Sequence, residues 1–196
     1  MKKLLTLALA LLLIVGCSST SSNPKDVAED FLDALSKGDL VKAQELTAPS
    51  QRDDDYDEGE IAGFDFDDDQ MAKEFSQKLF KDGFVVGDVV EEGDTAFANI
   101  TFTAPVMGQL MTSIFTISLQ KAFDEEFNQL SETEQEAELN RLFIEELDNT
   151  DYESYESKVY LIKENDKWYA ESLDGKNDSI IKPMMGGVGD IFDIED

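Results

Sequence analysis

The chain has 196 residues, of which 44 are acidic and 16 basic, so its formal net charge is −28; it contains no histidine and one cysteine. This charge argues against nucleic-acid binding and against docking of the folded body on anionic lipid, because both surfaces would repel it. Without histidine, Ser-His-Asp catalysis, Cys-His catalysis and histidine-based zinc sites are excluded, and one cysteine cannot form an internal disulfide.

The N-terminus has the composition of a secretory signal peptide. Two lysines precede an apolar run over residues 4–15, in which Thr6 is the only polar residue. A signal-peptide core takes about 7–15 residues, whereas a membrane-spanning helix needs about 20. The run is therefore too short to cross a bilayer, and we expect residues 1–16 to be a signal peptide.

The apolar run closes on Ile14-Val15-Gly16-Cys17, which resembles the bacterial lipobox. The resemblance implies that the Cys17 thiol receives a lipid, that cleavage precedes this residue, and that residues 17–23 form a polar tether. The protein would then be held on the extracytoplasmic face of the cell membrane, or on the outer membrane if the cell has two. Two alternatives are an ordinary signal peptide cut elsewhere, with an incidental cysteine, and a retained short anchor.

A pair of helices is expected next. Asn23 is a good N-cap and Pro24 suits the first helical position, and apolar residues then recur at helical spacing. Gly38 fits the position after a helix end, where a left-handed conformation is common. Asp39 can cap a second helix, which Pro49 would end.

Residues 53–69 contain ten acidic residues and no basic one, and we predict a loop there. Alternate aspartates begin like a calcium-binding EF-hand loop, but Glu58 replaces the sixth-position glycine and Phe64 the twelfth-position glutamate. We expect no cofactor and at most weak binding of calcium by a solvated loop. The side chains that would take part are Asp53, Asp55, Asp57, Asp65, Asp67 and Asp69.

Strand patterns follow a short helical segment. A helical pattern over residues 71–80 ends at Gly83, and alternating apolar residues then predict strands over 84–92 and 95–103. A third strand is predicted over residues 110–120, because Phe115, Ile117 and Leu119 alternate.

The second half of the chain combines helical and strand patterns. A helical pattern is expected over 123–130, and Ser131 with Glu134 predicts a capping box that opens a further helix. Two closing strands are predicted over 157–163 and 167–173. The tail, residues 174–196, shows no clear period and is expected to be loosely ordered. The predicted core draws on Phe31, Leu35, Phe75, Phe102, Phe115, Ile117, Leu161 and Trp168.

Helices followed by antiparallel strands indicate an α+β fold. The segments AEDFLDALSKGDLVKAQEL and VYLIKENDKWYAESL together resemble small bacterial lipoproteins of uncharacterised function with a nuclear-transport-factor-2-like (cystatin-like) domain. The resemblance covers residues 24–173 and implies N-terminal helices packed on a bent antiparallel sheet that encloses a cone-shaped cavity. The acidic insertion at 53–69 and a helical insertion at 122–149 depart from the family's pattern.

These features favour a membrane-anchored, non-catalytic binding or interaction module over an enzyme. Its ligand, a small molecule or a protein, is unknown, and its contact with the membrane would be the lipid on Cys17. The alternative is a small cavity enzyme, an isomerase or hydrolase that uses aspartate and tyrosine chemistry. Asp88, Tyr160 and Tyr169 are the candidates for that role, although ordinary packing and surface positions account for all three.

Overall fold

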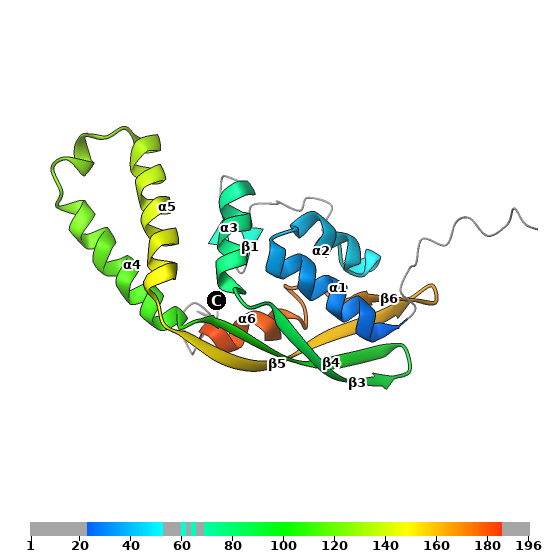
Figure 1. Ribbon diagram of the computed structural model, residues 1–196. Coiled ribbons are helices and arrows are strands. Elements are labelled where there is room, and N and C mark those ends of the chain that lie inside the picture. Colours follow the sequence, from blue (N-terminus) through cyan, green and yellow to red (C-terminus); the bar gives the residue numbers. More distant parts are fainter. Residues whose placement is uncertain (1–22, 53–59, 62–63, 66–68, 186–196) are drawn as a thin grey trace, which may run out of the picture.

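The structure, a computed structural model, describes residues 23–52, 60–61, 64–65 and 69–185 (Figure 1). The helices are α1 (Pro24–Lys37), α2 (Leu40–Leu46), α3 (Asp69–Leu79), α4 (Met107–Ala122), α5 (Glu132–Asn149) and α6 (Asp178–Met185), with 3-10 turns at Pro49–Gln51 and Phe127–Gln129. The strands are β1 (Glu60–Ile61), β2 (Phe64–Asp65), β3 (Phe84–Glu92), β4 (Thr95–Pro105), β5 (Tyr152–Glu164) and β6 (Lys167–Ala170). The fold is α+β, as predicted.

The caps predicted for the first two helices are present. The Asn23 side chain accepts a hydrogen bond from the Lys25 backbone N–H at 2.9 Å, and Asp39 caps α2 in the same way. Gly38 adopts a φ of 65°, and a Cβ at this position would lie 2.8 Å from the backbone of Lys73 in α3. Glycine is therefore required here both by the left-handed turn and by the close approach of α3.

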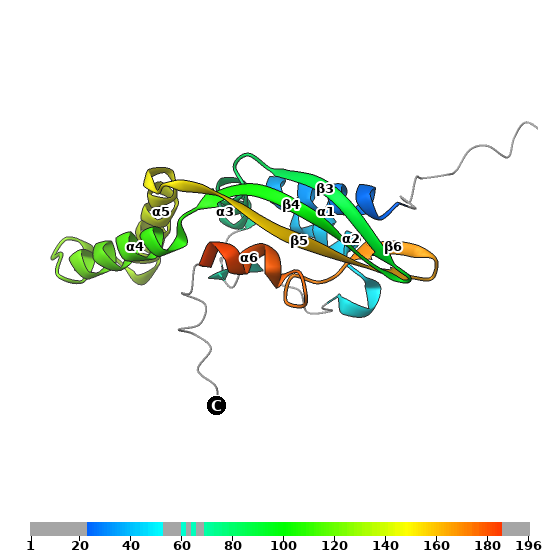
Figure 2. The same cartoon turned by 90° about the horizontal axis from the view of Figure 1, so that it is seen from below.

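The main sheet is antiparallel and open, with strand order β3-β4-β5-β6. β4 pairs with β5 along its whole length, from Thr95↔Ile162 to Pro105↔Tyr152. Helices α1, α2 and α3 lie over one face of this sheet (Figure 1, Figure 2). The side chains that alternate along β4 are buried on that face, as predicted: Ala96, Ala98, Ile100 and Phe102.

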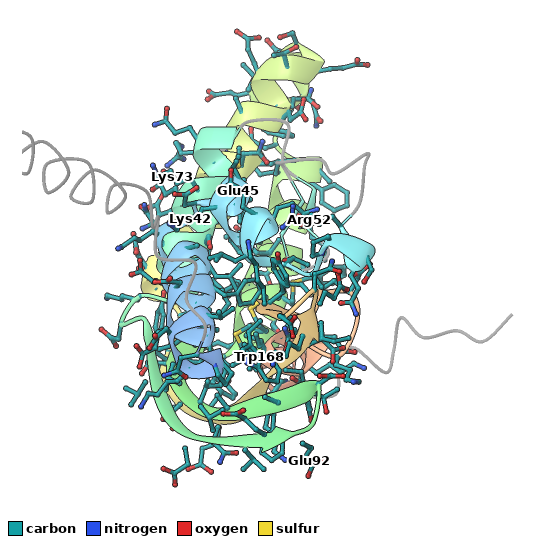
Figure 3. The ribbon with its side chains drawn as sticks, turned by 90° about the vertical axis from the view of Figure 1, so that its right-hand side faces the viewer. Lys42, Glu45, Arg52, Lys73, Glu92 and Trp168 are labelled. Carbon is teal, nitrogen blue, oxygen red and sulfur yellow. The ribbon has the colours of Figure 1, made fainter. Side chains whose placement is uncertain are left out.

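The core lies between this face and α1. Phe31, Leu32 and Leu35 of α1 are buried in it, together with Phe75 of α3 and Trp168 of β6 (Figure 3). Burial of large apolar side chains on one helical stripe and one sheet face is the main source of stability in such a layered fold. The predicted core residues that are confirmed are Phe31, Leu35, Phe75, Phe102, Leu161 and Trp168.

The last hairpin differs in length from the prediction. β5 begins five residues earlier than expected, at Tyr152, because it follows β4 to its end. β6 ends at Ala170 rather than at 173. Asn165 and Asp166 join the strands with positive φ values of 49° and 62°, as in a two-residue turn whose twist matches that of the strands.

α6 covers the edge of β5 that β6 leaves open. β6 pairs with residues 161–164 of β5. Beyond them, the Asn177 side chain accepts a hydrogen bond from the Tyr160 N–H (2.6 Å) and donates one to the Tyr160 carbonyl oxygen (3.1 Å). The Ser179 hydroxyl donates to the Lys158 carbonyl oxygen at 2.8 Å. Polar side chains thus take the place of a neighbouring strand.

A loosely ordered tail was predicted over residues 174–196. This prediction is wrong for the part that forms α6, Asp178–Met185. Ile180 and Met184 of α6 are buried in the main core. A helix this short shows too few turns for its period to stand out in the sequence. Residues 186–196 lie outside the described part of the chain.

Between β4 and β5 the chain forms a two-helix arm, residues 107–149, which extends beyond one end of the sheet (Figure 1, Figure 2). The strand predicted over 110–120 is wrong, because this segment belongs to α4. Leu110 is buried and Ile114 packs on the core, whereas Phe115 is exposed. The inward positions thus follow a helical period, and packing of the base of α4 overrides the strand preference of its threonines and isoleucines.

Phe115 and Ile117 are consequently not core residues, since Phe115 is exposed and Ile117 only half-buried. The helical pattern expected over 123–130 is wrong apart from a single 3-10 turn. The capping box is confirmed: the Glu134 carboxylate accepts a hydrogen bond from the Ser131 N–H at 2.9 Å, and the Ser131 side chain accepts one from the Glu134 N–H.

The loop predicted over 53–69 is wrong at the residues that the structure describes there. β1 and β2 form a short antiparallel pair with Ile61 opposite Phe64, and Asp69 already belongs to α3. Ile61 and Phe64 have high strand propensity, which outweighs the acidic residues around them.

Candidate functional site

Most of the residues proposed for lipid or metal binding cannot be placed. Cys17 lies outside the described residues, and so do Asp53, Asp55, Asp57 and Asp67. The backbone of Asp65 lies in β2 and that of Asp69 opens α3. Over residues 23–52, 60–61, 64–65 and 69–185, no three acidic or cysteine side chains are grouped so as to hold a metal ion. Weak calcium binding by the acidic segment stays a prediction.

The three residues considered for an enzyme do not meet on the buried face of the sheet. Tyr160 and Tyr169 alternate with the buried residues Val159, Leu161 and Trp168, so their side chains lie on the opposite face. Their rings are half-buried there, and Asp88 is exposed where the β3–β4 pairing is irregular. The inner face next to α1 is lined instead by packed apolar side chains.

An open groove of about 830 Å³ lies between α3 and α5. Its lining consists of Gln70, Lys73, Glu74, Gln77, Lys78, Lys81 and Asp148. The Lys78 ammonium lies 2.6 Å from both carboxylate oxygens of Asp148, and the Lys81 ammonium lies 5.4 Å from the Tyr152 ring centroid. Two of the three lysines are thus paired within the protein, and we interpret the groove as a contact that fastens α5 to α3.

Tyr152 completes this contact at the base of the arm. Its hydroxyl donates a hydrogen bond to the Lys78 carbonyl oxygen at 3.0 Å. Burial, and then the negative charges of Asp148 and Asp82, raise the pKa of Tyr152 above its ordinary value. The phenol therefore stays protonated and keeps its role as a donor.

The arm carries an exposed apolar surface that was not predicted from the sequence. Phe115, Leu119 and Phe123 are 65%, 47% and 85% exposed. They recur every four residues, so they form one ridge along the outside of α4, and we call these three residues the apolar ridge. Leu130 and Leu139, elsewhere on the arm, are also exposed. Of the eight large apolar side chains with the greatest exposure in the described chain, five therefore lie on the arm.

The ridge is exposed although the arm itself is well held. At its base Met107, Leu110 and Leu147 are buried in the main core, and the Phe143 ring of α5 lies 5.6 Å from the Phe75 ring of α3. The arm is thus packed against the body at one end. The ridge is exposed because no described part of the chain covers it.

A polar contact joins the two helices of the arm further out. The Lys121 ammonium lies 3.1 Å from Glu138 and 5.4 Å from the Phe127 ring centroid. Hydrogen bonds from Arg141, and then from Lys121, lower the pKa of Glu138 to about 2. Lys121 is the only charged residue of α4, so the single positive charge of this helix is engaged within the arm.

A signal for the ridge was present in the sequence. The spacing 115, 119, 123 is helical, but the alternation of 115, 117 and 119 is equally regular and favours a strand. No helix among the described residues is long and apolar enough to cross a membrane. No protein-family model matches the chain, and no curated protein matches it.

Proposed function

We propose that the protein is a lipid-anchored extracytoplasmic lipoprotein that works as a non-catalytic interaction module and presents the two-helix arm to a partner. The apolar ridge carries this proposal. A contiguous exposed apolar surface costs solubility and is typical of a binding surface, and here it sits on an arm that is firmly attached to the core. Outside the arm, the only large apolar side chains with such exposure in the described part of the chain are three scattered valines, Val41, Val85 and Val90.

The proposed fold is the cone-shaped, nuclear-transport-factor-2-like arrangement. An open antiparallel sheet with α1 packed across one face supports it. In this proposal the inner face serves as packed core, and the arm, an addition between β4 and β5, carries the binding function. A shared fold would not by itself identify an activity.

The membrane part of the proposal rests on Ile14-Val15-Gly16-Cys17. Mass spectrometry of the mature protein should show a lipid-modified Cys17 at its N-terminus and no residues 1–16. A Cys17→Ala variant should be released from the membrane or remain as an uncut precursor. A wild-type protein that is released from membranes with a free thiol at position 17 would contradict lipid anchoring.

The interaction part can be tested by photo-crosslinking in the full-length, membrane-anchored protein. A photoreactive phenylalanine analogue replaces Phe115 or Phe123 in cells of the source organism. We expect a discrete adduct from these positions and none from the same analogue at Val85, which is 70% exposed on β3. The absence of an adduct from both arm positions, or an identical pattern from Val85, would contradict the proposed function.

A further inference from the structure

From the charge around the ridge we infer the chemistry of the partner: a basic amphipathic helix of another protein, whose apolar face packs on Phe115, Leu119 and Phe123. This inference rests on the proposed function and adds the kind of partner. Three side chains at four-residue spacing cover about 12 Å of α4, at a rise of about 1.5 Å per residue. That is the length over which one helix packs its side chains between those of another.

The surroundings of the ridge carry negative charge. α4 contains no acidic residue, but the turn directly after Phe123 supplies Asp124, Glu125 and Glu126. At the far end of the connection between α4 and α5, the first turn of α5 is also acidic, with the exposed residues Glu132 and Glu134. Because Lys121 is already paired with Glu138, the arm offers an apolar strip with an acidic border. A partner with an apolar strip and a lysine- or arginine-rich border complements it.

Two other occupants are disfavoured on the same grounds. A second copy of this chain would bring another net charge of −28 to the contact, and like charges facing each other weaken association. An anionic lipid surface would be repelled in the same way.

The arm lies far from the proposed site of anchoring. α1 begins near the end of the sheet that is remote from the arm (Figure 1, Figure 2). β5 has 13 residues, which at about 3.3 Å per residue separate the two ends of the sheet by about 43 Å. The seven residues proposed as the tether reach at most about 25 Å. The ridge therefore lies farther from the start of α1 than the proposed tether is long, so the lipid on Cys17 would not by itself bring the ridge to the membrane.

A binding experiment with a defined peptide tests this partner chemistry. The probe is a synthetic amphipathic peptide of two Leu-Lys-Lys-Leu-Leu-Lys-Leu repeats, and its dissociation constant for the protein is measured by calorimetry at about 0.15 M salt. Two further peptides serve as comparisons, one with glutamate in place of lysine and one with the same composition in scrambled order. We expect the basic amphipathic peptide to bind at least ten times more tightly than either.

Matched variants then separate the ridge from the charge of the whole protein. Phe115→Gln with Phe123→Gln should weaken binding at least tenfold, whereas Val85→Thr should leave it unchanged. Glu125→Lys with Glu126→Lys should weaken binding more than Glu91→Lys with Glu92→Lys, which makes the same change in charge on the β3–β4 hairpin (Figure 3). Circular dichroism confirms that each variant is folded.

Several results would overturn the inference. Equal binding of the scrambled peptide, or equal weakening by both lysine pairs, would show attraction to charge alone. Tighter binding of the glutamate peptide would reverse the sign of the partner's charge. Self-association that Phe115→Gln with Phe123→Gln abolishes would assign the ridge to a second copy, and ridge-dependent binding to anionic vesicles would assign it to lipid. If any of these occurs while crosslinking at Phe115 still yields its adduct, the interaction function stands and only the partner chemistry is wrong.

Discussion

Leu110 and Phe115 lie five residues apart in one helix, yet the first is completely buried and the second mostly exposed. Leu110 lies at the base of the arm and packs into the core of the body, together with buried side chains of α1, α3 and the sheet. Phe115 belongs to the arm, where the same kind of side chain faces solvent. The comparison shows two environments for apolar residues in this chain: in the core they stabilise the fold, and along the apolar ridge they remain in contact with solvent.

The largest expected effect contrasts these two regions directly. Phe31→Ala should lower the free energy of unfolding by about 3–5 kcal/mol, because it leaves a cavity in a fully buried site. Phe115→Ala should change the free energy of unfolding by no more than about 0.5 kcal/mol, since the Phe115 side chain is mostly exposed and makes few contacts within the fold. Urea denaturation of both variants checks this. A loss above about 2 kcal/mol for Phe115→Ala would show that the ridge is structural.

A smaller effect is expected at the covered edge of β5. Asn177→Ala removes the hydrogen bonds of this side chain to the Tyr160 N–H and to the carbonyl oxygens of Tyr160 and Glu171. The Tyr160 carbonyl keeps a hydrogen bond from the Glu171 N–H, but the Tyr160 N–H loses the Asn177 acceptor in a part-buried site, at a cost of about 1–3 kcal/mol. Asn149→Ala, at the exposed end of α5, is the matched control and should have little effect. Equal stability of the two variants in thermal unfolding would show that α6 is not needed to protect the edge.

The smallest effect concerns pH and the arm alone. The pKa of Glu138 is lowered from 4.5 in the unfolded chain to about 2 in the folded arm. Its contribution to the stability of the arm is therefore fully present above about pH 4.5 and is lost as the pH falls towards 2. Glu138→Gln should remove this dependence, and Glu132→Gln, a matched change of charge in α5, should not. NMR titration of the Glu138 carboxyl group checks the value, and a midpoint near 4.5 would contradict the contact with Arg141 and Lys121.

The body could be predicted from the sequence because several local signals agree there. Asn23, Gly38 and the alternation along β4 each specify one conformation, and packing only reinforces it. α4 and α6 could not be predicted, for two different reasons. In α4 a two-residue and a four-residue spacing coincide at Phe115 and Leu119, and only contact of Leu110 with the core decides between them.

α6 and the candidate site were missed because their partners are distant in sequence. The role of Asn177 depends on the open backbone of Tyr160, which no local pattern reveals. The exposure of the ridge depends on whether another element packs over α4, and the tertiary fold as a whole decides that. Tyr160 and Asp88 have side chains of a type that enzymes use, but the fold does not bring them together, because chemical type alone does not determine position.

The two ends of the arm meet at a single point of the sheet. Pro105 pairs with Tyr152, and the Val106 N–H donates to the Asp151 carbonyl oxygen at 2.9 Å. The arm is therefore an insert in a hairpin, and its outer part can change in length or sequence while the register of β4 and β5 is kept. The part of the arm beyond Ile114 and Phe143, which both pack on the core, can therefore be exchanged by evolution or by a protein engineer without redesigning the scaffold that carries it.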